Sequence, residues 1–300
     1  MAARRQSGWQ AAALVLAAAA GFAAVLVANW PGHFPPDAIS ELAQGRSGVF
    51  NLWHPPLTAW LLGLADHISP DAGGFIVLEA ALFYGSLAAM AFIGRPGWLT
   101  ILVLALIAAS PLGLIYQGMV VKDVLFADVS LAAFVALGWA AKLWDRPGAR
   151  FGLIAVALVL FVAAALARQN GAVVAAIGAL CLAWLAGAKS RRRSRGPRIL
   201  SVAVTAAALV AIGVTAASLE FVAHSDRQPE EARQWMALQV YDLAGEVRRD
   251  PALPLGVLDR KAPSQAAFVR HQAAPAYDRT RADAILNLGA WKPLVKVPTP

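Results

Sequence analysis

Residues 11–29 of the chain read AAALVLAAAAGFAAVLVAN, a run of 19 residues without a charged side chain. About 20 apolar residues in helical conformation cross the hydrocarbon layer of a bilayer, so this run is long enough to span it. Six more apolar runs of similar length follow, at residues 72–92, 98–116, 124–141, 151–167, 171–188 and 199–218. The sequence therefore predicts an all-α integral membrane protein with about seven transmembrane helices.

The composition agrees with this fold class. The 300 residues are 59% hydrophobic and only 15% charged, whereas a soluble domain carries about 25% charged residues. The net charge of +8 comes mostly from short loops, where basic residues orient membrane helices, so we expect no nucleic-acid partner.

The one cysteine, Cys181, excludes an intrachain disulfide. With no Gly-rich phosphate loop and no Gly-x-Ser-x-Gly turn, the sequence also argues against a soluble nucleotide-using enzyme.

Loop charge predicts the topology. An eighth apolar segment, residues 55–65, has 11 residues and is too short to span, so we expect it to lie at the outer surface of the membrane. With the N-terminus in the cytoplasm, the cytoplasmic loops then hold twelve Lys and Arg residues and the outer loops three. A crossing by the short segment would reverse this bias, and positive charge favours the inside.

The composition changes after residue 220, which predicts two regions. Residues 1–220 form the transmembrane module, and residues 221–300 carry mixed charge without an apolar run long enough to span. This C-terminal segment is predicted to be small and extracytoplasmic, with an amphipathic helix over residues 233–246.

The outer loop at residues 30–71 holds the first candidate site residues. It begins Gly32-His-Phe-Pro-Pro-Asp-Ala-Ile-Ser-Glu41 and later reads His54-Pro-Pro-Leu57. Proline pairs fix the backbone beside Asp37 and His54, and polar groups on a stiff backbone at a membrane edge indicate a site. The alternative is an interfacial loop whose prolines only separate helices.

Polar residues from four parts of the chain are predicted to share the outer surface. They are Asp37, Glu41, His54, Lys122, Asp123, Arg168, Gln169 and Asn170. Each has a structural explanation as well, because Asp123 suits the start of a helix and residues 168–171 suit a turn. An arginine at an interface also commonly reaches phosphate headgroups. Their common side nevertheless favours an outward-facing active site.

Two acids, Glu79 and Asp128, lie inside predicted spans. Ionisable groups in the membrane interior are unfavourable and tend to face a cavity or a partner. We found no His/Cys cluster with the spacing of a zinc site.

Taken together, these motifs resemble the GT-C superfold of polytopic membrane glycosyltransferases. That group includes protein O-mannosyltransferases, aminoarabinose transferases and many uncharacterised bacterial members. The likeness covers roughly residues 10–220 and rests on Phe34-Pro-Pro-Asp37, His54-Pro-Pro-Leu57, Lys122-Asp-Val-Leu-Phe126 and Leu166-Ala-Arg-Gln-Asn-Gly171. Many members have two adjacent acids in the first loop, whereas Asp37 and Glu41 are four residues apart. On a helix that spacing would place both on one face.

The resemblance implies transfer of a sugar from a polyprenyl-phosphate donor to an extracytoplasmic acceptor at a bacterial inner membrane. Asp37, with Glu41, would then act as the catalytic base or help bind a divalent metal, Mg²⁺ or Mn²⁺. The lipid phosphate would be bound by the remaining candidates, His54, Lys122, Asp123, Arg168, Gln169 and Asn170.

Two other functions stay open: a non-catalytic carrier, flippase or assembly partner, and a sensor or anchor that works through the C-terminal segment. A carrier would place its polar residues near the middle of the membrane, where only Glu79 and Asp128 lie.

Overall fold

The computed structural model describes residues 2–50, 56–94, 98–168, 170–189, 210, 213, 228–281 and 283–286. The surroundings of side chains are described for these, except at residues 2–7, 70, 228–238, 283 and 286. The chain divides into two compact units, one within residues 1–224 and the other mainly residues 225–300, and each is described by itself.

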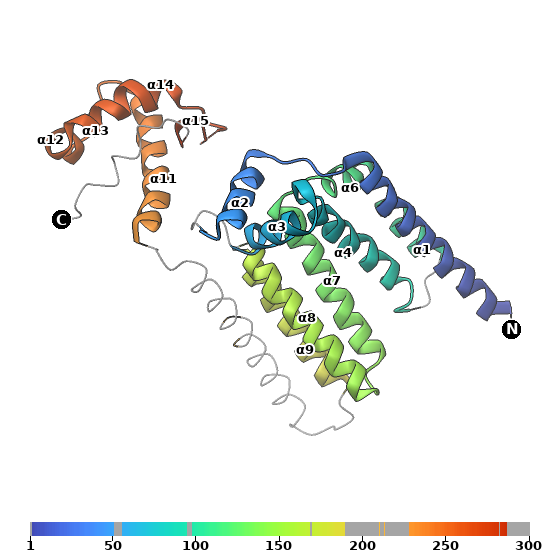
Figure 1. Ribbon diagram of the computed structural model, residues 1–300. Helices are drawn as coiled ribbons and strands as arrows, with labels where there is room; N and C mark the ends of the chain where they lie inside the picture. The colour runs from blue at the N-terminus through green and yellow to red at the C-terminus, as the bar shows by residue number, and fades with distance from the viewer. Residues whose placement is uncertain are drawn as a thin grey trace. The chain divides into compact units, whose positions relative to one another are not determined.

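The described elements of the first unit are all helices or helical turns, which confirms the all-α prediction (Figure 1). Its elements are α1 (Ala2–Asn29), α2 (Pro36–Ser47), α3 (Pro56–Ile68), the short turn η1 (Pro70–Ala72), α4 (Gly74–Met90), α5 (Trp98–Ala108), α6 (Pro111–Tyr116), α7 (Lys122–Lys142), α8 (Pro147–Ala167) and α9 (Gly171–Lys189).

Four of the described helices are long and apolar enough to cross a membrane: Gly8–Asn29 of α1, and the whole of α7, α8 and α9. Helix α4, with 17 residues, and α5, with 11, are apolar but shorter. The predicted span at residues 98–116 is divided, because α5 ends at Ala108 and Ser110 caps α6 by accepting a hydrogen bond from the Gly113 amide (2.9 Å). The predicted span at 199–218 lies almost entirely outside the described residues. The chain is thus a membrane protein by its apolar helices, and the count of seven spans stays a prediction.

Small residues allow the long helices to pack closely. Helices α7, α8 and α9 contact one another, and Phe161 of α8 is a fully buried member of their apolar cluster. A Cβ atom at Gly178 of α9 would lie 2.2 Å from the Phe161 ring, so any larger residue there would displace the ring. Helix α4 packs on α7 and, through a second cluster around Tyr84, on α1. Close approach through small residues is the usual packing mode of membrane helices, which cannot use a hydrophobic driving force.

Helices α2 and α3 pack together at one end of this bundle. Their apolar side chains, among them Ala38 and Leu62, share a buried cluster with Ile76 near the start of α4, Leu125 near the start of α7 and Ala167 at the end of α8. We call this end, where α7 begins, the Lys122 end, and the opposite one the Lys142 end. Residues 36–47, which the sequence analysis treated as loop, are therefore helical and belong to the core.

A short backbone pairing fixes the connection between α1 and α2. The His33 amide donates to the Gly118 carbonyl (2.9 Å), and the Val120 amide donates to the His33 carbonyl (3.0 Å). Asn29 supports the same corner, since its amide group donates to Val25 O (3.0 Å) and Leu114 O (3.2 Å). The segment before α2 is thereby joined to the segment before α7.

The second unit is a small helical assembly with its own core. It contains α11 (Gln228–Arg249), α12 (Val257–Lys261), α13 (Pro263–Phe268), the π-helical turn η2 (Val269–Ala273), α14 (Ala274–Ala276) and α15 (Asp283–Leu286). The predicted helix at residues 233–246 is confirmed as part of α11. Arg270 closes the fold by an ion pair with Asp259 (2.6 Å) and a hydrogen bond to the Leu253 carbonyl (2.9 Å).

Candidate functional site

The prolines before Asp37 start a helix. Pro35 has extended backbone angles, and Pro36 takes the first helical position, where its missing amide hydrogen is not needed. Asp37 then lies in the first turn, where a carboxylate interacts favourably with the helix dipole. Glu41 follows one turn later, so both carboxylates lie on one face of α2.

Lys122, at the start of α7, lies between these two acids. Its Nζ atom is 3.7 Å from Asp37 Oδ2 and 3.9 Å from Glu41 Oε1. The three side chains differ in exposure, from 66% for Asp37 to 17% for Lys122 and 2% for Glu41. The cluster therefore has a carboxylate open to solvent, an ammonium group beneath it and a buried carboxyl group.

The buried position of Glu41 changes its acidity. Removal from water disfavours the charged form and raises the pKa of Glu41 to about 7, against the lowering effect of Lys122 and with a further increase from Asp37. A carboxyl group of this kind gains or loses its proton near neutral pH, as a general acid or base does.

A second ion pair lies next to the first on α7. Arg168, the residue that ends α8, pairs with Asp123 through its guanidinium group. Both side chains are partly exposed. The chain turns sharply here, with the Gly171 amide donating to the Arg168 carbonyl (2.8 Å). A Cβ atom at Gly171 would lie 2.0 Å from the Ala164 carbonyl oxygen, so the turn requires glycine.

The structure thus brings five of the predicted site residues into two neighbouring ion-paired groups: Asp37, Glu41, Lys122, Asp123 and Arg168. Asn170 lies in the turn beside Arg168 with an exposed side chain, and its carbonyl accepts a hydrogen bond from Val173. His54 and Gln169 lie outside the described residues.

The residues of this site do not fit the divalent metal that the resemblance implies. Asp37 and Glu41 are both within 4 Å of the Lys122 ammonium group, whose positive charge opposes a cation at the same carboxylates. Among the described residues, no group of three or more His, Cys, Asp and Glu side chains is arranged to hold a metal ion. We therefore assign no step to a metal here.

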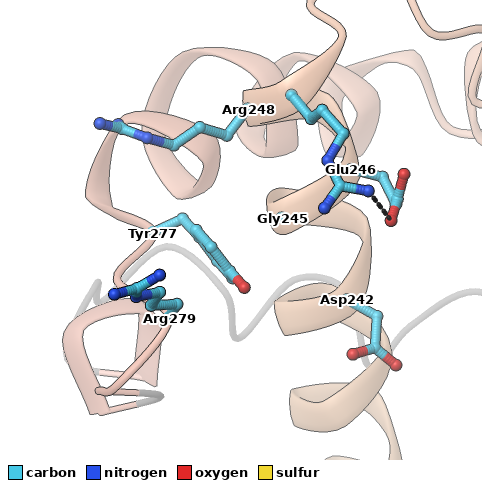
Figure 2. A pocket seen from close by; sticks show the side chains of 7 residues that line it. Asp242, Gly245, Glu246, Arg248, Tyr277 and Arg279 are labelled. Atoms are coloured by element: carbon cyan, nitrogen blue, oxygen red, sulfur yellow. Dashed lines mark ion pairs between the residues drawn. The ribbon is translucent and has the colours of Figure 1, made fainter.

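A groove on the second unit was not predicted from the sequence. It has a volume of about 410 Å³ and is lined by Asp242, Gly245, Glu246, Arg248, Arg249, Tyr277 and Arg279 (Figure 2). The Tyr277 ring lies beside Gly245, where a Cβ atom would approach it to 3.0 Å. The sequence places Arg279 near Tyr277, but these two residues line one groove with Arg248 and Arg249 only because η2 and α14 return the chain to α11.

The chain matches no protein-family model, no curated protein and no solved structure. The likeness to the GT-C glycosyltransferases therefore rests on the motifs alone.

Proposed function

We propose that the protein is a membrane glycosyltransferase, which transfers a sugar from a polyprenyl-phosphate donor to an extracytoplasmic acceptor at the Lys122 end. The observation that carries this proposal is the position of Lys122 between Asp37 and Glu41. A base for the acceptor and a cation for the leaving phosphate are the two groups that such a transfer needs.

The proposed step uses the exposed carboxylate of Asp37 as the base. The acceptor hydroxyl oxygen attacks the anomeric carbon of the sugar while its proton passes to Asp37. The bond between the anomeric carbon and the phosphate oxygen breaks, and the bonding electrons leave with the polyprenyl phosphate. Lys122 and Arg168 neutralise the charge that develops on this phosphate, because ammonium and guanidinium groups both bind phosphate oxygens.

The surface of α3 supports a lipid-linked donor. Trp60, Leu64 and Ile68 follow one another at intervals of four residues and are 59%, 50% and 75% exposed. This spacing places them on one stripe of a helix that is too short to span. A short helix with an exposed apolar stripe suits the membrane interface, where the phosphate of a lipid carrier also lies.

The test is native mass spectrometry of the full chain in mild detergent with added polyprenyl phosphate, in its free and in its sugar-loaded form. We expect one bound carrier in the wild type and a loss of at least tenfold in affinity in Lys122→Ala and Arg168→Ala. Lys142→Ala and Arg150→Ala are the matched controls, because they remove the same charges from the opposite ends of α7 and α8. Both should bind as the wild type does.

Three outcomes decide between the proposal, its non-catalytic alternative and neither of them. Carrier that binds and loses its sugar to an added acceptor supports the transferase. Carrier that binds without sugar transfer under any acceptor condition supports the non-catalytic carrier, and the absence of binding removes the donor assignment.

A further inference from the structure

Two acids are buried inside the first unit, away from the ion pairs of the Lys122 end. Glu79 of α4 is 0% exposed and Asp128 of α7 is 1% exposed. Each lies five or six residues after the first residue of its helix, which corresponds to a depth of about 8–9 Å at 1.5 Å per residue. No lysine or arginine of the described residues forms an ion pair with either acid.

The two carboxyl groups are close enough to interact. Helices α4 and α7 pack against each other, and the charge of Asp128 acts on the Glu79 carboxyl group. The backbone of Leu125 also lies close to the Glu79 carboxyl group, without a hydrogen bond of ordinary geometry. Leu125 precedes Asp128 by three residues, so both face the same side of α7. Glu79 therefore projects toward the face of α7 that carries Asp128.

Oxygen atoms outnumber donors in this cluster. Gln117 donates from Nε2 to both carboxylate oxygens of Asp128, at 2.9 and 3.1 Å. Both carboxylate oxygens of Glu79 and the Oε1 atom of Gln117 are buried and have no hydrogen-bond partner among the described residues. A buried acceptor without a donor is strongly unfavourable, and more so when it belongs to a carboxylate.

Gln117 reaches Asp128 because the helix predicted at residues 98–116 is interrupted. The span predicted at residues 98–116 is interrupted at Ser110, and α6 then carries the chain to Gln117, which is only 5% exposed. In membrane proteins, interrupted helices recur where an ion or substrate is bound inside the bundle, because their backbone groups and termini serve the ligand.

We propose that Glu79, Asp128 and Gln117 form an intramembrane binding site for a hard metal cation. The site offers five oxygen atoms, four from carboxylates and one from an amide, and neither nitrogen nor sulfur ligands to favour a transition metal. A cation between Glu79 and Asp128 compensates two carboxylates that otherwise face each other in an apolar bundle. Sodium and calcium share this chemistry, and the experiment below distinguishes them. The proposal does not depend on sugar transfer.

The test follows thermal unfolding of the full chain in detergent while choline chloride is replaced stepwise by sodium or calcium chloride at constant ionic strength. A ligand at a hundredfold excess over its Kd should raise the Tm by roughly 5 °C or more, with saturation. We expect this shift with one of the two ions in the wild type, and its loss in Glu79→Gln and Asp128→Asn. Ser130→Ala is the matched control on α7, because the Ser130 hydroxyl donates to the Phe126 carbonyl (2.6 Å) and not to the acids of the cluster.

Binding of radioactive sodium or calcium to the wild type gives a second measurement that does not depend on the variants. One ion bound per chain supports the site and identifies the ion. The proposal is overturned if neither ion binds or raises the Tm, or if both acid variants keep the full shift.

Discussion

Gly45 of α2 and Gly63 of α3 face each other with their backbones in contact. A Cβ atom at Gly45 would lie 2.2 Å from the Ala59 carbonyl oxygen and 2.7 Å from the Gly63 amide nitrogen. Arg46, the residue after Gly45, forms a two-pronged ion pair with Asp66, with both N–O distances at 2.8 Å. The helix that carries Asp37 and Glu41 is thus positioned on α3 by two adjacent glycines.

Replacement of Gly45 by alanine should separate the two helices. Because the contact is with backbone atoms that cannot move aside, we expect a loss of about 1–3 kcal/mol in the free energy of unfolding. Thermal unfolding in detergent measures this loss. Gly85→Ala of α4 is the control, since a Cβ atom there meets nothing within 4 Å. Equal stability of both variants would mean that α2 and α3 do not pack as described.

Protonation of Glu41 should make stability depend on pH. The folded state raises the pKa of Glu41 from 4.5 to about 7, so the folded protein keeps this proton to a higher pH than the unfolded chain does. The stabilisation is complete below pH 4.5 and is lost as the pH rises through 7, on the order of 3 kcal/mol in total. Glu41→Gln should flatten the profile between these limits, whereas the surface change Glu246→Gln on α11 should leave it as in the wild type.

The two acids of α2 should contribute differently to sugar transfer. Asp37→Asn removes the proposed base and should lower kcat by roughly 10²–10⁴-fold with the donor still bound. Glu41→Gln keeps the exposed base and should have a smaller effect, mainly on the pH profile of kcat. The check is an assay of sugar release at several pH values, with native mass spectrometry as the measure of donor binding. Full activity in Asp37→Asn would remove its assignment as the base.

Asp123 should compete with the donor for Arg168. In the present arrangement the guanidinium group is paired with the Asp123 carboxylate, which a phosphate must displace. Asp123→Asn should therefore tighten polyprenyl-phosphate binding by a few-fold, in line with about 1 kcal/mol for a partly exposed ion pair. Titration with the donor under native mass spectrometry measures the change. Weaker binding would indicate that Asp123 holds Arg168 in its working position instead.

The sequence predicted the features that depend on local composition. Apolar runs identified α1, α7, α8 and α9 as candidate spans. The spacing of Asp37 and Glu41 was also sufficient to expect one helical face. These signals are local, since each depends on residues within a few turns of one another.

What the sequence could not predict depends on long-range packing. Helix α2 looked like loop because its sequence is polar, and it is stabilised by packing on α3 and by Ala38, which shares a buried cluster with residues of α4, α7 and α8. Gln117 gave no signal of its own, because its importance comes from the approach of α6 to Asp128 on the next helix. Nor could the pKa of Glu41 be predicted, since it follows from burial beneath Lys122 and not from the neighbouring residues.

The backbone pairing of His33 with Gly118 and Val120 has a consequence for how the site can vary. It joins the segment before α2 to the segment before α7, and Asp37 and Lys122 each lie only a few residues after this pairing. A long lysine side chain can bend, but it cannot make up for a helix that begins one turn too late. An insertion between Gly32 and Pro36 would leave every charged group present while moving the acids out of reach of the lysine. The spacing between the acids of α2 and Lys122 is therefore encoded in the lengths of two connections as well as in the side chains that they align.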